Sequence, residues 1–318
     1  MTAPPLPPTT LRAKVRTKEA GSLHRSGVIG RAWYVPYLFL LPCLILFGVF
    51  FVWPAIQAGQ LSLYKYNVVD PPEFIGFDNF GRALTNPAFW QVLGNSFIYM
   101  IGLLPFAIVF PLLLAILVNR QLRGIKFFRA VYFLPVITSM VAVSVAWNFL
   151  FADQGLLNAF LQWIGVPDAP IHFLLDSRWA PFSIILVEGW KGMGTYMMIF
   201  LAGLQAIPDS LYEAARVDGA NAWQRLRHIT VPMIRPFLAV ALTMEMLAAM
   251  QVFTSVYMLT RGGPDGSTRS LGYYVWSEAF EGFRMGYASA VGILLCSILI
   301  LLSVVNYRIG RMQENQGD

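Results

Sequence analysis

Three charged side chains lie within long apolar stretches of the chain. Glu188 and Lys191 belong to the segment EGWKGMGTY. The next apolar segment contributes another group of polar side chains: Glu245, Gln251, Thr254 and Ser255. A charged group facing lipid costs about 2.5–3.5 kcal/mol or more, so such residues normally face a cavity or a partner. Polar groups that bind hydroxyls, with aromatic rings such as Trp190 and Tyr196 beside them, favour a site for a carbohydrate.

The same two charges have a second interpretation. Glu188 and Lys191 are three residues apart, so on a helix their side chains share one face. They are equally consistent with a structural ion pair and with a solute pocket, and the two interpretations are compatible.

The sequence predicts no catalytic residues and no metal site. No His/Asp, Cys/His or paired-carboxylate arrangement occurs on the connecting loops, and the three histidines have no ligand spacing. Cys43 and Cys296 each stand alone in an apolar run, which favours a role in core packing. The phosphate-binding pattern GxxxxGK[ST] is absent, and its nearest approach, GWKGMGT, lacks the lysine before the threonine. Any ATP must therefore be hydrolysed by another subunit.

The composition is that of a membrane protein. Of 318 residues, 57% are hydrophobic and 13% charged, and the apolar residues form runs of about twenty, enough to span a bilayer. We predict an all-α integral membrane protein with six transmembrane helices near 34–60, 92–118, 127–150, 180–203, 231–259 and 286–307. The net charge of +6 comes from residues at the ends of apolar runs, which favours membrane topology over nucleic-acid binding.

The basic residues predict the orientation and the domain boundaries. Sixteen Lys and Arg residues fall on the side of the two termini and of the 2–3 and 4–5 loops, against six on the other side. Both termini are therefore predicted to be cytoplasmic. Residues 1–33 are Pro-rich and basic and are predicted to form a disordered cytoplasmic tail. Residues 34–318 are predicted to form the six-helix domain, with a cytoplasmic loop at about 204–230.

Two further patterns concern helix packing. Prolines within the first three spans predict a kinked, packed bundle. In the last span, Gly286/Ala290 and Ala288/Gly292 have the four-residue spacing that allows close helix contact, either within the chain or with another subunit.

The loop at 204–230 has the sequence pattern of two short helices. Ser210 and Glu213 fit a capping box at the start of the first helix. Gly219 suits the left-handed position that ends it, and Asn221 with Gln224 can cap the second helix. On capping alone, a well-capped connector remains an alternative to a functional element.

Within this loop, EAARVDGANAWQRLRHITVP closely resembles the EAA loop of ABC importer permeases. Val231 stands where that family usually has Leu, and Leu226 where it usually has Phe. The segments FIGFDNFGRAL, RAVYFLPVITSMVAVSVAW, GMGTYMMIFLAGLQAIP and LTRGGPDGST are similar to the carbohydrate-importer branch, of the MalF and UgpA kind. The resemblance covers the chain from about residue 34 and implies a type I ABC importer permease of the bacterial cell membrane.

The resemblance also implies roles for particular residues. Those that couple to the ATPase would be Glu213, Ala214, Ala215, Asp218 and Gly219. Positions that match substrate contacts are Glu188, Lys191, Gly192 and Thr195 in the fourth span, and Glu245, Ala248, Ala249 and Val252 in the fifth. Several of these residues differ from the maltose-type pattern of amide and aromatic side chains, so we do not expect a maltose-like pose.

The implied partners are a second, MalG-like permease, an ATPase homodimer that binds ATP and Mg, an extracytoplasmic solute-binding protein and membrane lipid. No cofactor is expected in this chain. The predicted function is import of a mono- or oligosaccharide. Alternatives are the same machine importing glycerol phosphate or another polar solute, and a secondary transporter that works alone. A membrane enzyme is disfavoured by the missing catalytic residues.

Overall fold

The computed structural model describes residues 34–119, 124–167 and 169–314. The predicted disordered tail, residues 1–33, lies outside the described residues, as do Arg120 and Arg123 of the 2–3 loop. The chain divides into two compact units, Met1–Pro54 and Ala55–Asp318.

The first unit contains an apolar helical segment. Helix α1 (Val35–Phe47) continues through the π-helical segment η1 (Gly48–Val52), and α2 (Trp53–Leu61) begins in this unit and ends in the second. Tyr37–Leu61 is long and apolar enough to cross a membrane, and none of its apolar window is buried. Such an apolar surface needs cover from lipid, from another protein or from the rest of the chain.

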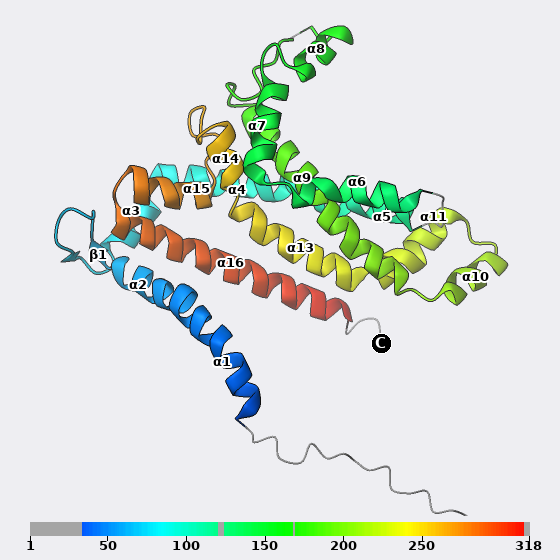
Figure 1. The fold of residues 1–318 in the computed structure, drawn as a ribbon, viewed down its shortest axis with the longest axis horizontal. Helices are drawn as coiled ribbons and strands as arrows, with labels where there is room; N and C mark the ends of the chain where they lie inside the picture. The colour runs from blue at the N-terminus through cyan, green and yellow to red at the C-terminus, as the bar shows by residue number, and fades with distance from the viewer. Residues whose placement is uncertain (1–33, 120–123, 168, 315–318) are drawn as a thin grey trace, which may run out of the picture. The chain divides into compact units, whose positions relative to one another are not determined.

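The second unit is helical apart from one small hairpin (Figure 1). Its elements up to the large central loop are β1 (Tyr64–Lys65), β2 (Glu73–Phe74), α3 (Asp78–Thr85), α4 (Pro87–Leu104), η2 (Pro105–Val109), α5 (Phe110–Val118), α6 (Ile125–Ile137), α7 (Met140–Phe151) and α8 (Leu156–Trp163). The remainder are α9 (Ala180–Gln205), α10 (Asp209–Val217), α11 (Ala222–Arg225), η3 (Leu226–Thr230), α12 (Val231–Met233), α13 (Arg235–Met250), α14 (Thr254–Leu259), α15 (Leu271–Trp276), η4 (Ser277–Glu281) and α16 (Met285–Glu314).

The hairpin is a small departure from the all-α prediction. β1 and β2 pair antiparallel, with Tyr64 opposite Phe74. The buried side chain of Asn79 holds the start of this hairpin, because its amide donates to the carbonyls of Ser62 and Tyr64, both at 2.9 Å. The hairpin is therefore tied to α3 rather than free in the loop.

The six predicted spans are present in a modified form. The described residues contain five helices long and apolar enough to span a membrane, or six if the bent pair Ala222–Met233 and Arg235–Met250 counts as one span. That pair is bent by 68°. Two predicted spans are not continuous helices. The span at 127–150 is broken between α6 and α7, and the span at 231–259 is broken between α13 and α14.

The break between α6 and α7 leaves polar backbone groups that side chains satisfy. Thr138 has extended backbone angles, so the helix ends there. Its hydroxyl donates to the carbonyl of Leu134 at 3.0 Å, and the ammonium of Lys191 donates to the carbonyl of Val136 at 3.4 Å. Unpaired carbonyls at membrane depth are costly, and these two side chains make the break tolerable.

Three of the π-helical segments precede prolines. η1, η2 and η3 end two residues before Pro54, Pro111 and Pro232, respectively. A proline inside a helix lacks an N–H and crowds the preceding turn, and a wider π turn is one way to accommodate it. Of the prolines predicted to kink the first three spans, Pro54 and Pro111 follow such a widened turn, whereas Pro42 and Pro135 lie inside α-helices without one.

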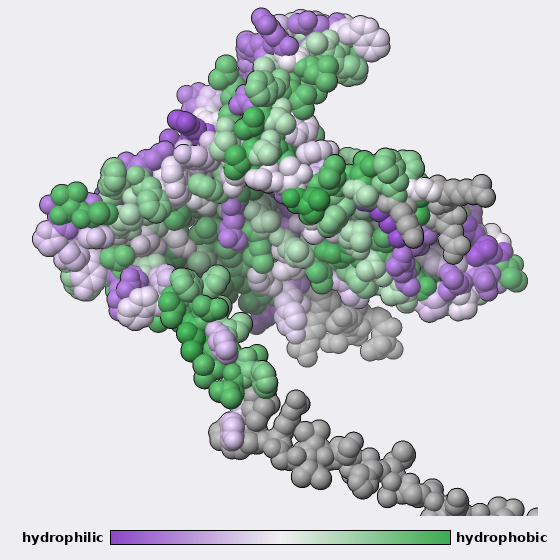
Figure 2. Space-filling model, viewed as in Figure 1, coloured by the Kyte–Doolittle hydropathy of each residue, from purple (hydrophilic) through white to green (hydrophobic). Residues whose placement is uncertain are grey.

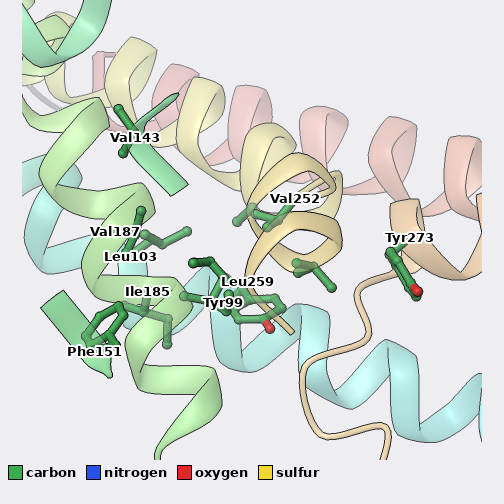
Figure 3. Packing of buried hydrophobic residues seen from close by; sticks show 12 residues of the cluster. Tyr99, Leu103, Val143, Phe151, Ile185, Val187, Val252, Leu259 and Tyr273 are labelled. Carbon is green, nitrogen blue, oxygen red and sulfur yellow. The ribbon is translucent and has the colours of Figure 1, made fainter. Parts of the chain in front are cut away.

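α9 is the centre of packing in the second unit. It packs against α4, α5, α6, α13 and α14. One apolar core cluster joins α9 with α4, α7 and α14, and Figure 3 shows Tyr99, Ile185 and Val252 converging within it. A second cluster surrounds Met197 and Phe200 towards the end of α9. The two clusters hold most of the length of α9 in place.

The small residues of the last span are used within the chain. In α16, Ala288 and Ala290 are buried, and a Cβ on Gly286 would collide with the carbonyl oxygen of Tyr64. This favours internal packing over an intersubunit contact for this stretch. By contrast, the prediction that Cys43 and Cys296 pack in the core was wrong, because both are exposed.

The surface separates by polarity. In Figure 2, apolar side chains cover much of the visible surface of the helices, and hydrophilic residues gather around α10 and α11. Many of the large apolar side chains on the long helices are exposed, including Ile101, Leu117 and Ile300. This arrangement suits helices surrounded by lipid or other subunits, and a loop in water.

Candidate functional site

The predicted pathway residues of the fourth span lie on α9, which is an unbroken helix of 26 residues. Its glycines do not interrupt the helix, and two of them allow close approach of neighbouring elements. A Cβ on Gly189 would collide with the ring of Phe106, and one on Gly194 would lie 2.5 Å from the carbonyl oxygen of Tyr132. Gly192 differs, since its nearest neighbour would be a ring carbon of Tyr196 at 3.6 Å.

A cavity of about 390 Å³ opens beside the charged residues of α9. Its wall combines the ends of several helices, and the lining residues are Met140, Glu188, Lys191, Ala248, Gln251, Val252, Phe253 and Thr254. The volume is within the range of small-molecule sites. The break after Met250 contributes to this wall, because it turns the backbone of residues 251–253 towards α9.

Glu188 and Lys191 have separate partners. A carboxylate oxygen of Glu188 accepts a hydrogen bond of 2.5 Å from the hydroxyl of Ser255. The ammonium of Lys191 reaches the carbonyl of Val136, at the end of α6. Neither residue takes part in the direct ion pairs found among the described residues. No direct ion pair joins them, although Lys191 is close enough to act electrostatically on the Glu188 carboxyl. Both charges border the cavity, and the pocket and the structural pair both stay predictions.

The other predicted pathway residues are distributed around this cavity. Ala248 and Val252 line it with Glu188 and Lys191, whereas Ala249 is fully buried in the core. Tyr196 and Glu245 are both buried and lie close to each other, outside the cavity lining. The structure thus brings four of the predicted residues to one wall.

Three predicted residues on α9 occupy other positions. Gly192 and Thr195 are half-buried and do not line the cavity. Trp190 is 39% exposed and makes an edge contact with Trp147, with ring centroids 5.7 Å apart. It therefore lies on a different face of α9 from Lys191.

An aromatic group next to the cavity was not predicted. Phe253 lines the cavity and stacks on Tyr257 at 5.7 Å, while Trp276 contacts both rings, at 5.6 and 5.0 Å. These residues come from α14, the break before it, and α15. Because the break in the fifth span was not predicted, no local pattern indicated that Phe253 would turn towards Glu188.

The predicted coupling loop forms two helices joined at a glycine. Gly219 has a φ of +78°. Its N–H donates to the backbone carbonyl of Arg216, and the N–H of Ala220 donates to the backbone carbonyl of Ala215. These two bonds form the Schellman motif that ends α10. Asn221 and Gln224 form the predicted capping box at α11. The capping box predicted at Ser210 was wrong: Pro208 precedes the first residue of α10, so Ser210 lies inside the helix.

The predicted coupling residues are largely accessible. Glu213, Ala214, Asp218 and Gly219 are exposed, and Ala215 is half-buried. The loop is also tied internally, by a 2.9 Å hydrogen bond between the hydroxyls of Tyr212 and Thr230 and by a 3.1 Å bond from Arg225 to the carbonyl of Ala220. These bonds tie α10 to η3 and hold the turn between α10 and α11.

A helical membrane unit with an internal polar cavity and a rigid, exposed two-helix loop is the architecture of a transport permease. The chain belongs to the family described as "Binding-protein-dependent transport system inner membrane component", which matches residues 80–315. It is 33% identical to the lactose transport system permease protein LacF of Rhizobium radiobacter over 282 residues, which is 87% of this chain and 94% of LacF. It is 31% identical to the arabinooligosaccharides transport system permease protein AraP of Bacillus subtilis over 290 residues, covering 89% and 90% of the two chains.

A solved structure has the same fold. A chain of a bacterial ABC transporter involved in the import of the acidic polysaccharide alginate superposes with a TM-score of 0.76. It is 28% identical and the match covers 88% of this chain and 96% of that chain. The protein is therefore a multi-pass inner-membrane permease subunit of an ABC importer, and it is not itself an enzyme.

Proposed function

We propose that this permease imports a carbohydrate through the cavity bordered by Glu188 and Lys191. The observation that carries the proposal is the composition of that wall. A carboxylate, an ammonium, the Gln251 amide and the Thr254 hydroxyl share about 390 Å³ with the ring of Phe253. Sugar hydroxyls both donate and accept hydrogen bonds, and the apolar face of a sugar ring packs on aromatic side chains.

The same wall favours an uncharged sugar over a phosphorylated solute. Lys191 alone would suit a phosphate, but Glu188 lies in the same cavity. An acidic side chain offers a phosphate no positive charge, and when ionised it repels an anion. Relatives named for lactose and arabinooligosaccharides support the carbohydrate class. Glycerol phosphate remains the second candidate solute.

We further propose that α10 and α11 dock on a separate ATPase. Glu213, Ala214, Ala215, Asp218 and Gly219 would form the contact, and the rigid elbow would transmit ATPase closure to α9 and α13. The excess of basic residues on this side supports a cytoplasmic position for this loop and both termini. The remaining partners would be a second permease, a second ATPase copy and an extracytoplasmic solute-binding protein. The bacterial alginate ABC transporter, solved in complex with an alginate pentasaccharide-bound periplasmic protein, supports the last of these.

The proposed solute class is tested by reconstitution with the binding protein. ATPase stimulation and uptake are measured for neutral mono- and oligosaccharides, polyols and glycerol phosphate at equal concentration. We expect stimulation by a neutral saccharide. Stimulation by glycerol phosphate alone would replace the carbohydrate assignment with the second candidate.

The cavity assignment is tested by Lys191→Ala and Glu245→Ala. Both should reduce uptake at least tenfold, because each removes a polar group at or beside the pathway, and both should leave complex assembly intact. The matched control is Thr138→Val, which removes a cap from the same broken end of α6 without touching the cavity. Normal uptake in both test variants, or equal loss in the control, would exclude the pocket.

A further inference from the structure

A second, larger cavity lies at the loop end of the second unit. It has a volume of about 680 Å³ and is formed by α5, the end of α9, α10, α11 and η3. One part of its lining is apolar and comes from Leu113, Ile116, Leu204 and Leu226. The other part is polar and includes Tyr212, Arg216, Arg225 and Thr230.

The two parts of the lining lie on either side of the ends of the membrane spans. Leu113 and Ile116 belong to the last two turns of the span that ends at Val118, and Leu204 is the penultimate residue of the span that ends at Gln205. Arg216 and Arg225 belong to the loop that follows. The cavity therefore joins the ends of two candidate spans to the loop, where the hydrocarbon of a bilayer would give way to phospholipid headgroups.

Among the described residues, the two arginines at this level form no direct ion pair with an acidic group, although Asp218 lines a neighbouring pocket with Arg225. Arg216 donates to the carbonyl of Tyr212 at 3.3 Å, and Arg225 donates to the carbonyl of Ala220 at 3.1 Å. Within the described ranges, neither forms an ion pair with a carboxylate. A guanidinium has five N–H donors, so most of their donors remain available to an anion.

Trp223 completes the rim of this cavity. It lines the cavity and is 67% exposed. Tryptophan is enriched at the membrane–water interface, because its ring is amphipathic. A large exposed indole beside two cations at this level is typical of a surface that contacts lipid headgroups.

We propose that this cavity binds one anionic phospholipid from the cytoplasmic leaflet. The headgroup phosphate would lie between Arg216 and Arg225, and the first segments of the acyl chains would lie against Leu113, Ile116 and Leu204. Because these residues belong to α5, α9, α10 and α11, the lipid would join the loop to the ends of two spans and stiffen it. The inference depends on the proposed cytoplasmic placement of the loop and is independent of the transported solute.

The test is a lipid titration of the full-length chain, delipidated in detergent and followed by native mass spectrometry. The probes are phosphatidylglycerol and phosphatidylcholine with identical acyl chains. The unchanged chain should bind one phosphatidylglycerol in preference to phosphatidylcholine. Arg216→Gln/Arg225→Gln should weaken phosphatidylglycerol binding about 25-fold, at roughly fivefold for each basic residue near a headgroup.

The control is Arg227→Gln/Arg235→Gln, which removes the same charge from exposed residues that do not line the cavity. It should bind phosphatidylglycerol as the unchanged chain does. If Arg216→Gln/Arg225→Gln fails to fold, the single variants Arg216→Gln and Arg227→Gln give the same comparison. Arg216→Gln should then weaken phosphatidylglycerol binding about fivefold, and Arg227→Gln should leave it unchanged. Equal loss in test and control variants, or none in either, would overturn the proposal.

A competition measurement separates a lipid from a free phosphate compound. Soluble glycerol phosphate is added at the concentration at which phosphatidylglycerol saturates the site. It should displace little of the lipid, because it lacks the contacts to the apolar wall. Complete displacement would overturn the lipid assignment and would indicate a site for a soluble anion.

Discussion

At the residue scale, Lys191 connects the cavity to the broken helix α6. Its ammonium lines the cavity and also donates to the carbonyl of Val136. At 3.4 Å this is a long hydrogen bond. A solute hydroxyl that accepts from the ammonium would compete with that carbonyl. Binding of a solute in the cavity would therefore weaken the hydrogen bond from Lys191 to the end of α6.

Gly219 carries the sharpest residue-scale prediction. Its φ of +78° suits glycine, and a Cβ there would meet nothing within 4 Å. A substitution therefore acts through the backbone alone. Gly219→Val should strain the elbow by more than the roughly 1–2 kcal/mol of an ordinary left-handed residue and should lower the ratio of solute imported to ATP hydrolysed.

The matched variant is Gly219→Asn, because asparagine tolerates the left-handed region. It should retain most of the coupling ratio in the same reconstituted assay. If valine and asparagine have equal effects, or if valine has none, the conformation at Gly219 is not what couples the loop.

Residue types singled out Glu188 and Lys191 for the candidate site, and the family resemblance singled out Ala248 and Val252. The charges at 188 and 191, and the residues 248 and 252, lie on the cavity wall, and the cap at Asn221 and the turn at Gly219 were recognisable from local patterns. The bond from Ser255 to Glu188 was not predictable, because it joins residues 67 apart in sequence across a break. Capping depends on neighbours along the chain, whereas such contacts depend on tertiary packing.

At the element scale, α9 is held close to α6 by a glycine rather than by complementary side chains. Gly194→Ala would place a Cβ 2.5 Å from the backbone oxygen of Tyr132, which cannot move without shifting α6. The same substitution at Gly192 meets only a ring carbon at 3.6 Å. The two positions are one half-turn apart on one helix, so they form a matched pair.

We expect Gly194→Ala to lower the free energy of unfolding by about 1–3 kcal/mol, the usual cost of overpacking. Gly192→Ala should be neutral or slightly stabilising, because alanine is the better helix former. Denaturation of both variants in the same detergent gives the comparison. Equal stability of the two would show that α6 does not pack against Gly194 as described.

The elements also show why two predicted spans were wrong. Hydropathy stays high across Thr138 and across Gln251, so an apolar window passes over both breaks. The breaks depend on side chains that satisfy freed carbonyls, such as Thr138 and Lys191, and one of these lies on another helix. A hydropathy pattern describes one stretch of sequence at a time, so it does not include a hydrogen bond donated from another helix.

At the scale of the whole molecule, the exposed apolar surface implies an assembly in the membrane. The first span has no buried residue in its apolar window. Lipid covers part of such a surface, but the family to which the chain belongs works with further subunits. The family description, binding-protein-dependent transport, and the proposed ATPase contact at α10 and α11 both lead us to expect an ATPase on another chain.

Co-purification tests this requirement. The affinity-tagged chain, extracted in mild detergent, should bring with it a second permease and two copies of an ATPase. Glu213→Arg should reduce recovery of the ATPase at least tenfold, because it reverses an exposed charge on the proposed contact, and should leave the second permease bound. Recovery of a functional transporter without any ATPase would favour the secondary transporter.

The widened turns before the prolines have a consequence for register. Each π turn adds one residue relative to an α-helix, and one residue corresponds to about 100° of rotation. Deleting one residue from η2 would therefore rotate α5 about its axis and turn Ala115 and Val118 away from α9 and towards lipid. The extra residue sets the direction in which the second half of that span faces, so single-residue deletions should be tolerated far less there than in the loops.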